Sequence, residues 1–142
     1  MRKLVLLLAA AGVLTVATAA LAGTNGASWS AKLTAAQEIP KQTVKAPAAN
    51  GAFTATLSGN KLKWKLTFAK LSGAATAAHI HLGAKGKAGN VLIPLCGPCR
   101  SGVSGSAALT GAVMKDFTKH LLYVNVHTAK NPAGEIRGQL GG

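Results

Sequence analysis

The chain has 142 residues, of which 16 are Lys or Arg and only 3 are Asp or Glu, so its formal net charge is +13. A chain of this length forms one domain with a single core, and so basic a surface favours anionic surroundings such as cell-surface polymers or phospholipid head groups. Phe, Trp and Tyr make up only 4% of the sequence. Because a nucleic-acid platform interleaves aromatic side chains with its charges, we do not expect specific nucleic-acid binding.

Residues 1–22 have the pattern of a secretory signal peptide. Arg2 and Lys3 precede a short apolar run, which ends in two small-x-small patterns at 17–19 and 20–22. The alternative is a permanent membrane anchor, but the apolar run is short and leads directly into the cleavage pattern. We therefore expect a secreted or periplasmic protein with no transmembrane segment after cleavage.

Residues 23–31 are expected to be a flexible lead-in, and residues 32–140 the domain. Alternating polar and apolar residues predict strands at 30–35, 51–57, 61–68, 77–82, 91–95, 103–109, 121–127 and 135–140. The clearest of them is the strand at 61–68. Its apolar residues, Leu62, Trp64, Leu66 and Phe68, should face the core, and its lysines, Lys61, Lys63 and Lys65, should face the solvent.

The segments between the strands are rich in Gly, Pro and Asn, which are turn formers. Residues 110–120 are the one segment with a helical pattern, with Thr110 or Asp116 as the capping residue. Eight short strands joined by such turns predict an all-β, antiparallel sandwich or small barrel.

The two cysteines, Cys96 and Cys99, stand in a Cys-Gly-Pro-Cys motif. This motif is typical of thioredoxin-like redox enzymes, in which a helix follows the first cysteine. Here residues 100–105 favour a loop and a strand, so a local disulfide is the expected state in an exported protein. A thiolate pair that binds a metal ion is the remaining alternative.

Three histidines are predicted to share one polar face. His79 and His81 are two residues apart, so in a strand they point to the same side, with Cβ atoms about 6.5–7 Å apart, while Ile80 points into the core. In the strand at 121–127, His127 alternates with Val124 and Val126, which should point toward the core. If the two strands are neighbours, the three imidazoles form a small metal site, and copper generally binds nitrogen ligands most tightly among divalent first-row ions. The alternative is that these histidines face solvent without a ligand.

Two further polar residues are expected beside the site. Asn125 is two residues from both Tyr123 and His127 in the strand and so belongs to the same face. Glu135 has the parity of His127 and is expected to accept a hydrogen bond from a ligand imidazole, which would fix its tautomer. The alternative is that Glu135 pairs with Arg137 or with a surface lysine.

Three blocks of the sequence resemble the CHRD domain, a family named for its occurrence in chordin and widespread in exported bacterial proteins. They are residues 78–81 before a glycine loop, residues 122–128, and the closing Asn-Pro-Ala-Gly-Glu-Ile-Arg-Gly-Gln-Leu block at 131–140. The similarity covers about residues 32–140. It implies an immunoglobulin-like β-sandwich, in a family whose biochemical role in bacteria is poorly defined.

A weaker resemblance is to the copper/zinc superoxide dismutases, which hold copper with a His-x-His pair and a later Val-His strand. His79, His81 and His127 match those positions by motif. The chain has no counterpart of the bridging histidine, of the zinc-loop histidines with their aspartate, or of the intersheet disulfide. Neither dismutase activity nor a zinc ion of that kind is therefore expected.

Two classes of function remain. The first is a non-catalytic copper-binding module with His79, His81 and His127 as ligands. The second is an interaction or adhesion domain that binds an anionic polymer or a protein partner without a metal ion. An enzyme comes third, because no Ser-His-Asp arrangement is visible and three acidic residues leave little scope for a carboxylate pair.

Overall fold

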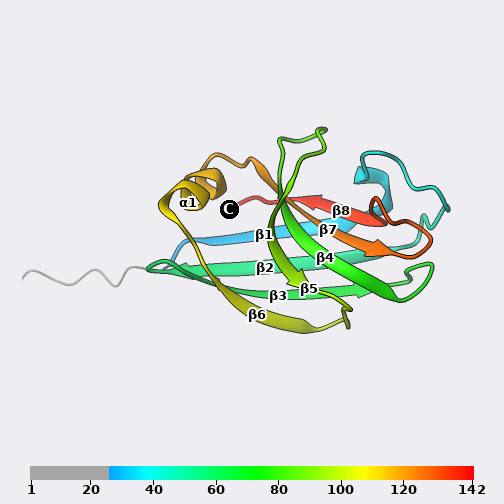
Figure 1. The fold of residues 1–142 in the computed structure, drawn as a ribbon, viewed down its shortest axis with the longest axis horizontal. Helices are drawn as coiled ribbons and strands as arrows, with labels where there is room; N and C mark the ends of the chain where they lie inside the picture. Colours follow the sequence, from blue (N-terminus) through cyan, green and yellow to red (C-terminus); the bar gives the residue numbers. More distant parts are fainter. Residues whose placement is uncertain (1–25) are drawn as a thin grey trace, which may run out of the picture.

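The computed structural model describes residues 26–142, so the predicted signal peptide lies outside the described residues. Figure 1 shows strands crossing one another in two layers, with one helix at an end of the molecule. The elements are β1 (Ser28–Thr34), η1 (Ala35–Gln37), β2 (Asn50–Ser58), β3 (Lys61–Ala69), β4 (Ala75–Leu82), β5 (Val91–Cys96), β6 (Val103–Ala108), α1 (Gly111–Thr118), β7 (Leu122–Thr128) and β8 (Ile136–Gln139).

All eight strands belong to one antiparallel sheet with the order β5-β4-β7-β8-β1-β2-β3-β6. The sheet folds over on itself, so that β5-β4-β7-β8 forms one layer and β1-β2-β3-β6 the other (Figure 1). The seam between the layers is narrow: β1 meets β8 at the Thr34–Arg137 pair, and Ser30 forms an isolated bridge with Gly141. The predicted all-β antiparallel sandwich is confirmed, with a nearly barrel-like closure.

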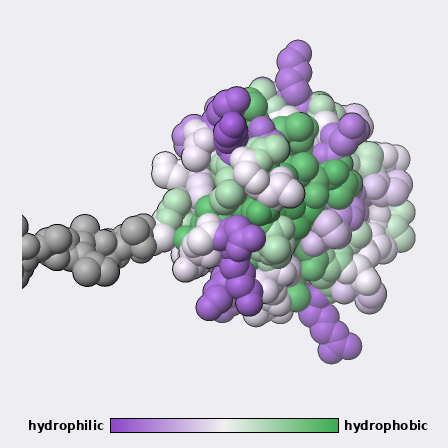
Figure 2. Space-filling view, turned by 60° about the vertical axis from the view of Figure 1, so that its left-hand side comes forward, coloured by the Kyte–Doolittle hydropathy of each residue, from purple (hydrophilic) through white to green (hydrophobic). Residues whose placement is uncertain are grey.

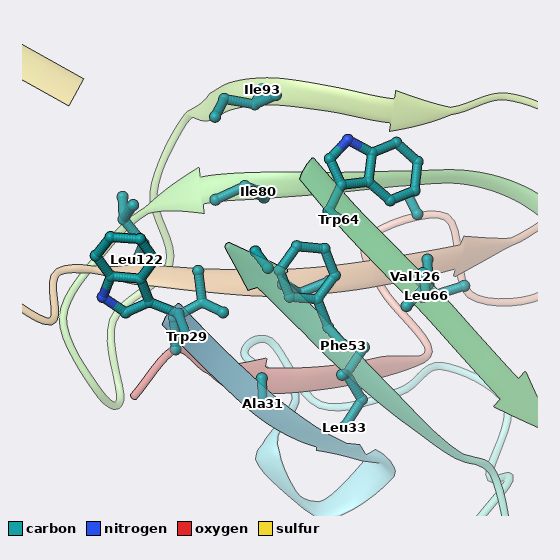
Figure 3. Packing of buried hydrophobic residues seen from close by; sticks show 14 of the residues in the cluster. Trp29, Ala31, Leu33, Phe53, Trp64, Leu66, Ile80, Ile93, Leu122 and Val126 are labelled. Carbon is teal, nitrogen blue, oxygen red and sulfur yellow. The ribbon is translucent and has the colours of Figure 1, made fainter. Parts of the chain in front are cut away.

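The core lies between the two layers and is built from alternate residues of the strands. Figure 3 shows apolar side chains of both layers meeting there. Leu62, Trp64 and Leu66 of β3 are 0%, 7% and 0% exposed, as their alternation predicts. Phe68 is only half-buried, because it lies near the end of β3.

β1 begins earlier than the sequence indicates. It starts at Ser28, inside the segment 23–31 that is expected to be a flexible lead-in. Trp29 accounts for this difference, since its indole is buried and its ring centroid lies 4.8 Å from that of Phe117 in α1. A buried tryptophan contributes a large apolar area to a core, and it therefore holds the first residues of the strand in the sheet.

The two local predictions on the cap and the cysteines are settled by the structure. Thr110 is the N-cap of α1, because its Oγ1 accepts a hydrogen bond from the Val113 amide at 3.4 Å. Cys96 and Cys99 form a disulfide. The residues that follow Cys99 form a turn and then β6, without the helix that a thioredoxin-like centre needs.

Candidate metal centre

The three predicted histidines converge on the outer face of the β4–β7 pair. In this antiparallel pair His79 lies opposite Asn125, His81 opposite Tyr123 and Ala77 opposite His127. Paired residues share a face, so strand parity places all three imidazoles on the side away from the core. Their possible ligand nitrogens lie within 4.8 Å of one another.

Backbone carbonyls orient two of the three rings. His81 Nδ1 lies 2.9 Å from the carbonyl oxygen of Gly89, and His127 Nδ1 lies 3.0 Å from that of Pro132. A carbonyl only accepts hydrogen bonds, so both Nδ1 atoms carry the proton in the neutral rings. Nε2 of each ring is then the lone-pair nitrogen, and a carbonyl behind the ring is a usual partner of a metal-ligating histidine.

Ring nitrogens of the three histidines meet at the centre of the cluster. His127 Nε2 lies 3.1 Å from His79 Nδ1, which donates the proton between them. His81 Nε2 is buried and has no hydrogen-bond partner among the described residues. Such an orphaned buried acceptor is rare and is costly unless something binds it.

These donors fit a first-row metal ion after a small adjustment. Two nitrogens at 2.0–2.1 Å from one ion are at most about 4.2 Å apart, and the cluster spans up to 4.8 Å. The side chains of His79 and His127 are half-buried, and that of His81 is buried. His79 is the ring that no backbone carbonyl orients among the described residues, so the adjustment falls mainly on its half-buried side chain.

Burial favours the neutral, metal-binding form of all three rings. Desolvation lowers the pKa of His79, and the neighbouring His127 and His81 lower it further. Desolvation also lowers the pKa of His81 and of His127, although their hydrogen bonds to Gly89 and Pro132 act in the opposite direction. Protons therefore compete with a metal ion for these nitrogens only below the ordinary histidine pKa of 6.5.

Tyr123 supports His81 from the neighbouring strand. Its ring stacks on the His81 imidazole with centroids 4.8 Å apart and an interplanar angle of 11°. The Arg137 guanidinium lies 3.4 Å from the centroid of the same ring, which is a cation–π contact. The Tyr123 hydroxyl also binds the amide and the carbonyl of Gly89, the residue that orients His81. The sequence gives no signal for this stack, because Arg137 comes from the far side of a turn.

Glu135 does not take the expected place beside a histidine. It is fully buried, and its carboxylate accepts hydrogen bonds from the amide and hydroxyl of Ser72, from Thr128 and from Asn131. Burial alone would raise its pKa, but these hydrogen bonds lower it below the ordinary value. In place of the expected bond to Glu135, His127 Nδ1 donates to the carbonyl of Pro132 at 3.0 Å. The alternative of a pair with Arg137 or a surface lysine is not formed either, because the oxygens are occupied by neutral donors.

Asn125 lies on the expected face but turns to a different partner. Its Nδ2 donates to both carboxyl oxygens of Glu38, at 2.9 and 3.0 Å. Glu38 is fully buried, and desolvation raises its pKa to about 7 against the opposing effects of Asn125 and Arg137. The sequence gives no signal for this role of Glu38, because the residue stands in a loop without periodicity.

The closing block at 131–140 connects the long loop before β2 to the β7–β8 turn. The Asn131 side chain bonds both the amide and the carbonyl of Val44, and Gln42 donates to the Glu135 carbonyl at 2.6 Å. Gly134 has φ +141°, and a Cβ there would lie 2.5 Å from Glu38 Oε2. The block is therefore structural: it holds the turn that presents Pro132 to His127.

The fold and the histidine cluster together define an all-β sandwich domain with a candidate metal centre on its outer face. Residues 29–140 match the family model of the CHRD domain, so the chain belongs to the CHRD-domain family. No curated protein and no solved structure matches it. The resemblance to the CHRD domain is thereby confirmed, whereas the weaker resemblance to copper/zinc superoxide dismutases receives no support.

Family membership indicates an extracellular type of module. In the part of the chain that the structure describes, no helix is long and apolar enough to cross a membrane.

Proposed function

We propose that this protein is exported and binds one copper ion through His79, His81 and His127, as a non-catalytic module for copper storage, transfer or protection. The observation that carries the proposal is the buried, unpartnered Nε2 of His81 beside the other two imidazoles. The pattern of residues 1–22 supports export, and so does the disulfide, because disulfides persist in oxidising compartments.

Copper is favoured by the ligand set. Three neutral imidazoles suit copper, zinc or nickel, and copper is the most tightly bound of these divalent ions. The grouping of possible metal ligands contains no carboxylate, whereas Mg²⁺ and Ca²⁺ prefer oxygen ligands. His79 would carry its proton on Nε2 instead of Nδ1, so that Nδ1 of the neutral ring is free to bind the ion, while the carbonyls of Gly89 and Pro132 keep the other two rings in place.

Copper titration of the purified protein tests this proposal. His79→Ala and His127→Ala each remove a ligand, so we expect each to weaken copper binding by at least about 100-fold, more than the loss of an outer partner usually costs. His120→Asn is the matched control, because His120 is exposed, lies outside the cluster and has φ 54°, which Asn tolerates. Equal affinity in wild type and both alanine variants would refute the proposed site.

A second candidate function, an interaction domain for anionic polymers, is favoured by the distribution of charge. Glu38 and Glu135 are two of the three acidic residues of the chain, and both are fully buried. Asp116 is thus the one carboxylate side chain left at the surface of the described residues. Binding of an anionic polymer that weakens steeply with salt would support this function.

A further inference from the structure

The outer face of the other layer, β1-β2-β3, carries only polar or small side chains. Neighbouring strands place Lys65, Thr54 and Ser30 in one cross-strand row, because Lys65 pairs with Thr54 and Thr54 with Ser30. The next row is Lys63, Thr56 and Ser28. All six side chains are exposed.

These rows form a groove whose floor is β2. The outward residues of β2 are short, whereas lysines stand on both sides, Lys61, Lys63 and Lys65 on β3 and Lys32 on β1. Three hollows of about 540, 420 and 220 Å³ lie on this face, and Thr54 lines all three of them. From Asn50 to Thr56 the floor is about 20 Å long, at about 3.4 Å per residue. We call this feature the β2 groove.

Lysines supply the side-chain charge of the groove. None of the residues that line the three hollows is acidic. Among the described residues every Lys and Arg except Arg137 is exposed. Figure 2 shows such long hydrophilic side chains projecting from the surface, apart from one another. Alternate lysines of β3 repeat about every 6.5–7 Å, so they present a row of positive charges along the groove rather than a single cationic point.

We propose that the β2 groove binds a linear acidic polysaccharide. The lysines match its carboxylates, and the hydroxyls of Ser28, Ser30, Thr54 and Thr56 can both donate to and accept from sugar hydroxyls. A single-stranded nucleic acid needs several exposed aromatic side chains for stacking, but the one aromatic lining residue that is not buried is Phe68. A lipid surface would call for large apolar side chains that insert between head groups, and the one apolar outward residue of the floor is Ala52.

This inference gives the second candidate function a surface and a partner class, and it is independent of copper. The groove lies on β1-β2-β3, and the histidines lie on β4 and β7 in the other layer. The polymer-binding test can therefore be run with a chelator present, and His79→Ala should bind the polymer as the wild type does. Failure of copper binding would leave the polymer-binding result unchanged, and failure of polymer binding would leave the copper result unchanged.

The test is binding of the purified protein to polygalacturonate, with neutral dextran, a DNA oligonucleotide and anionic vesicles as competing probes. We expect the double variant Lys63→Gln/Lys65→Gln to bind polygalacturonate about tenfold more weakly. The matched control, Lys119→Gln/Lys130→Gln, removes the same charge from positions outside the groove and should change the affinity by less than about threefold.

A third variant tests the shape of the groove separately from its charge. Thr54→Phe fills the shared floor without changing the net charge, so it should also weaken binding, whereas Thr54→Ser should retain it. Thermal unfolding of each variant confirms that the exposed substitutions leave the fold intact. Equal losses in the two double variants, wild-type binding by Thr54→Phe, or tighter binding of DNA or vesicles than of polygalacturonate would each overturn the proposal.

Discussion

Main-chain atoms fix the ligand nitrogens of His81 and His127. The Gly89 carbonyl accepts a hydrogen bond from His81 Nδ1 and another from the Tyr123 hydroxyl, at 2.9 and 3.3 Å. Gly89 lies so close to β4 that any larger residue would collide with it, since a Cβ would be 1.6 Å from the Leu82 carbonyl oxygen. The tautomer of His81 therefore depends on a residue that carries no side chain.

Gly89→Ala should weaken copper binding although it changes no ligand. The new methyl group must displace the loop from Leu82, so the carbonyl leaves His81 Nδ1, and we expect a loss of affinity of about tenfold or more. Gly73→Ala is a suitable control, because a Cβ at Gly73 meets nothing within 4 Å. Isothermal titration with copper compares the two. Wild-type affinity in Gly89→Ala would show that the carbonyl does not position the ring.

Glu38 should make the protein less stable as the pH rises. Its pKa is about 7 in the folded chain against an ordinary 4.5, so the folded state holds this proton over a range in which the unfolded state has lost it. The stability that the protonated Glu38 contributes to the folded state is complete below pH 4.5 and is lost as the pH rises through 7.

Glu38→Gln cannot ionise, so it should gain stability relative to the wild type between pH 4.5 and 8, by about 3 kcal/mol at most. Urea unfolding of both proteins at several pH values measures this difference. A constant difference across the range would contradict the raised pKa.

At the residue scale the histidines were predictable and their partners were not. Period-two alternation places His79, His81 and His127 on one face as soon as β4 and β7 are neighbours. Strand parity does not predict the partners of Glu135, because the residue stands at the turn and accepts a hydrogen bond from Ser72 in a distant loop. Glu38 contacts Asn125, and Arg137 contacts Tyr123, because the fold brings distant segments together. Local sequence patterns do not predict such contacts.

At the scale of elements, β1 joins the two layers and depends on one side chain. Trp29 packs on Phe117 of α1 and is 6% exposed. Trp29→Ala should lower the free energy of unfolding by about 3–5 kcal/mol, the usual cost of truncating a buried aromatic residue. Thermal or denaturant unfolding measures the loss. A change below about 1 kcal/mol, typical of a surface site, would mean that the start of β1 contributes little.

Strong alternation made β3 predictable, since Leu62, Trp64 and Leu66 repeat every second residue. The start of β1 was missed because Ser28-Trp29-Ser30 follows small polar residues and holds only one large apolar side chain. Its place in the sheet is set by tertiary contacts with α1 and β2, which a short window of sequence does not contain.

At the scale of the whole molecule, the two layers carry different chemistry on their outer faces. One layer presents three imidazoles, and the other presents lysines above a floor of hydroxyl groups. The apolar core lies between them (Figure 3). Two binding surfaces on opposite layers would let the protein hold a metal ion while it is attached to a polymer. The sequence predicted the sandwich and its excess of charge, but the groove depends on strand register, which places β2 between lysine-bearing strands.

X-ray absorption at the copper edge of the protein loaded with one equivalent of copper tests the metal site most directly. We expect three imidazole nitrogens at about 2.0 Å from the ion, without sulfur, because Cys96 and Cys99 are joined to each other. Fewer than three imidazoles, or a sulfur ligand, would contradict the three-histidine centre.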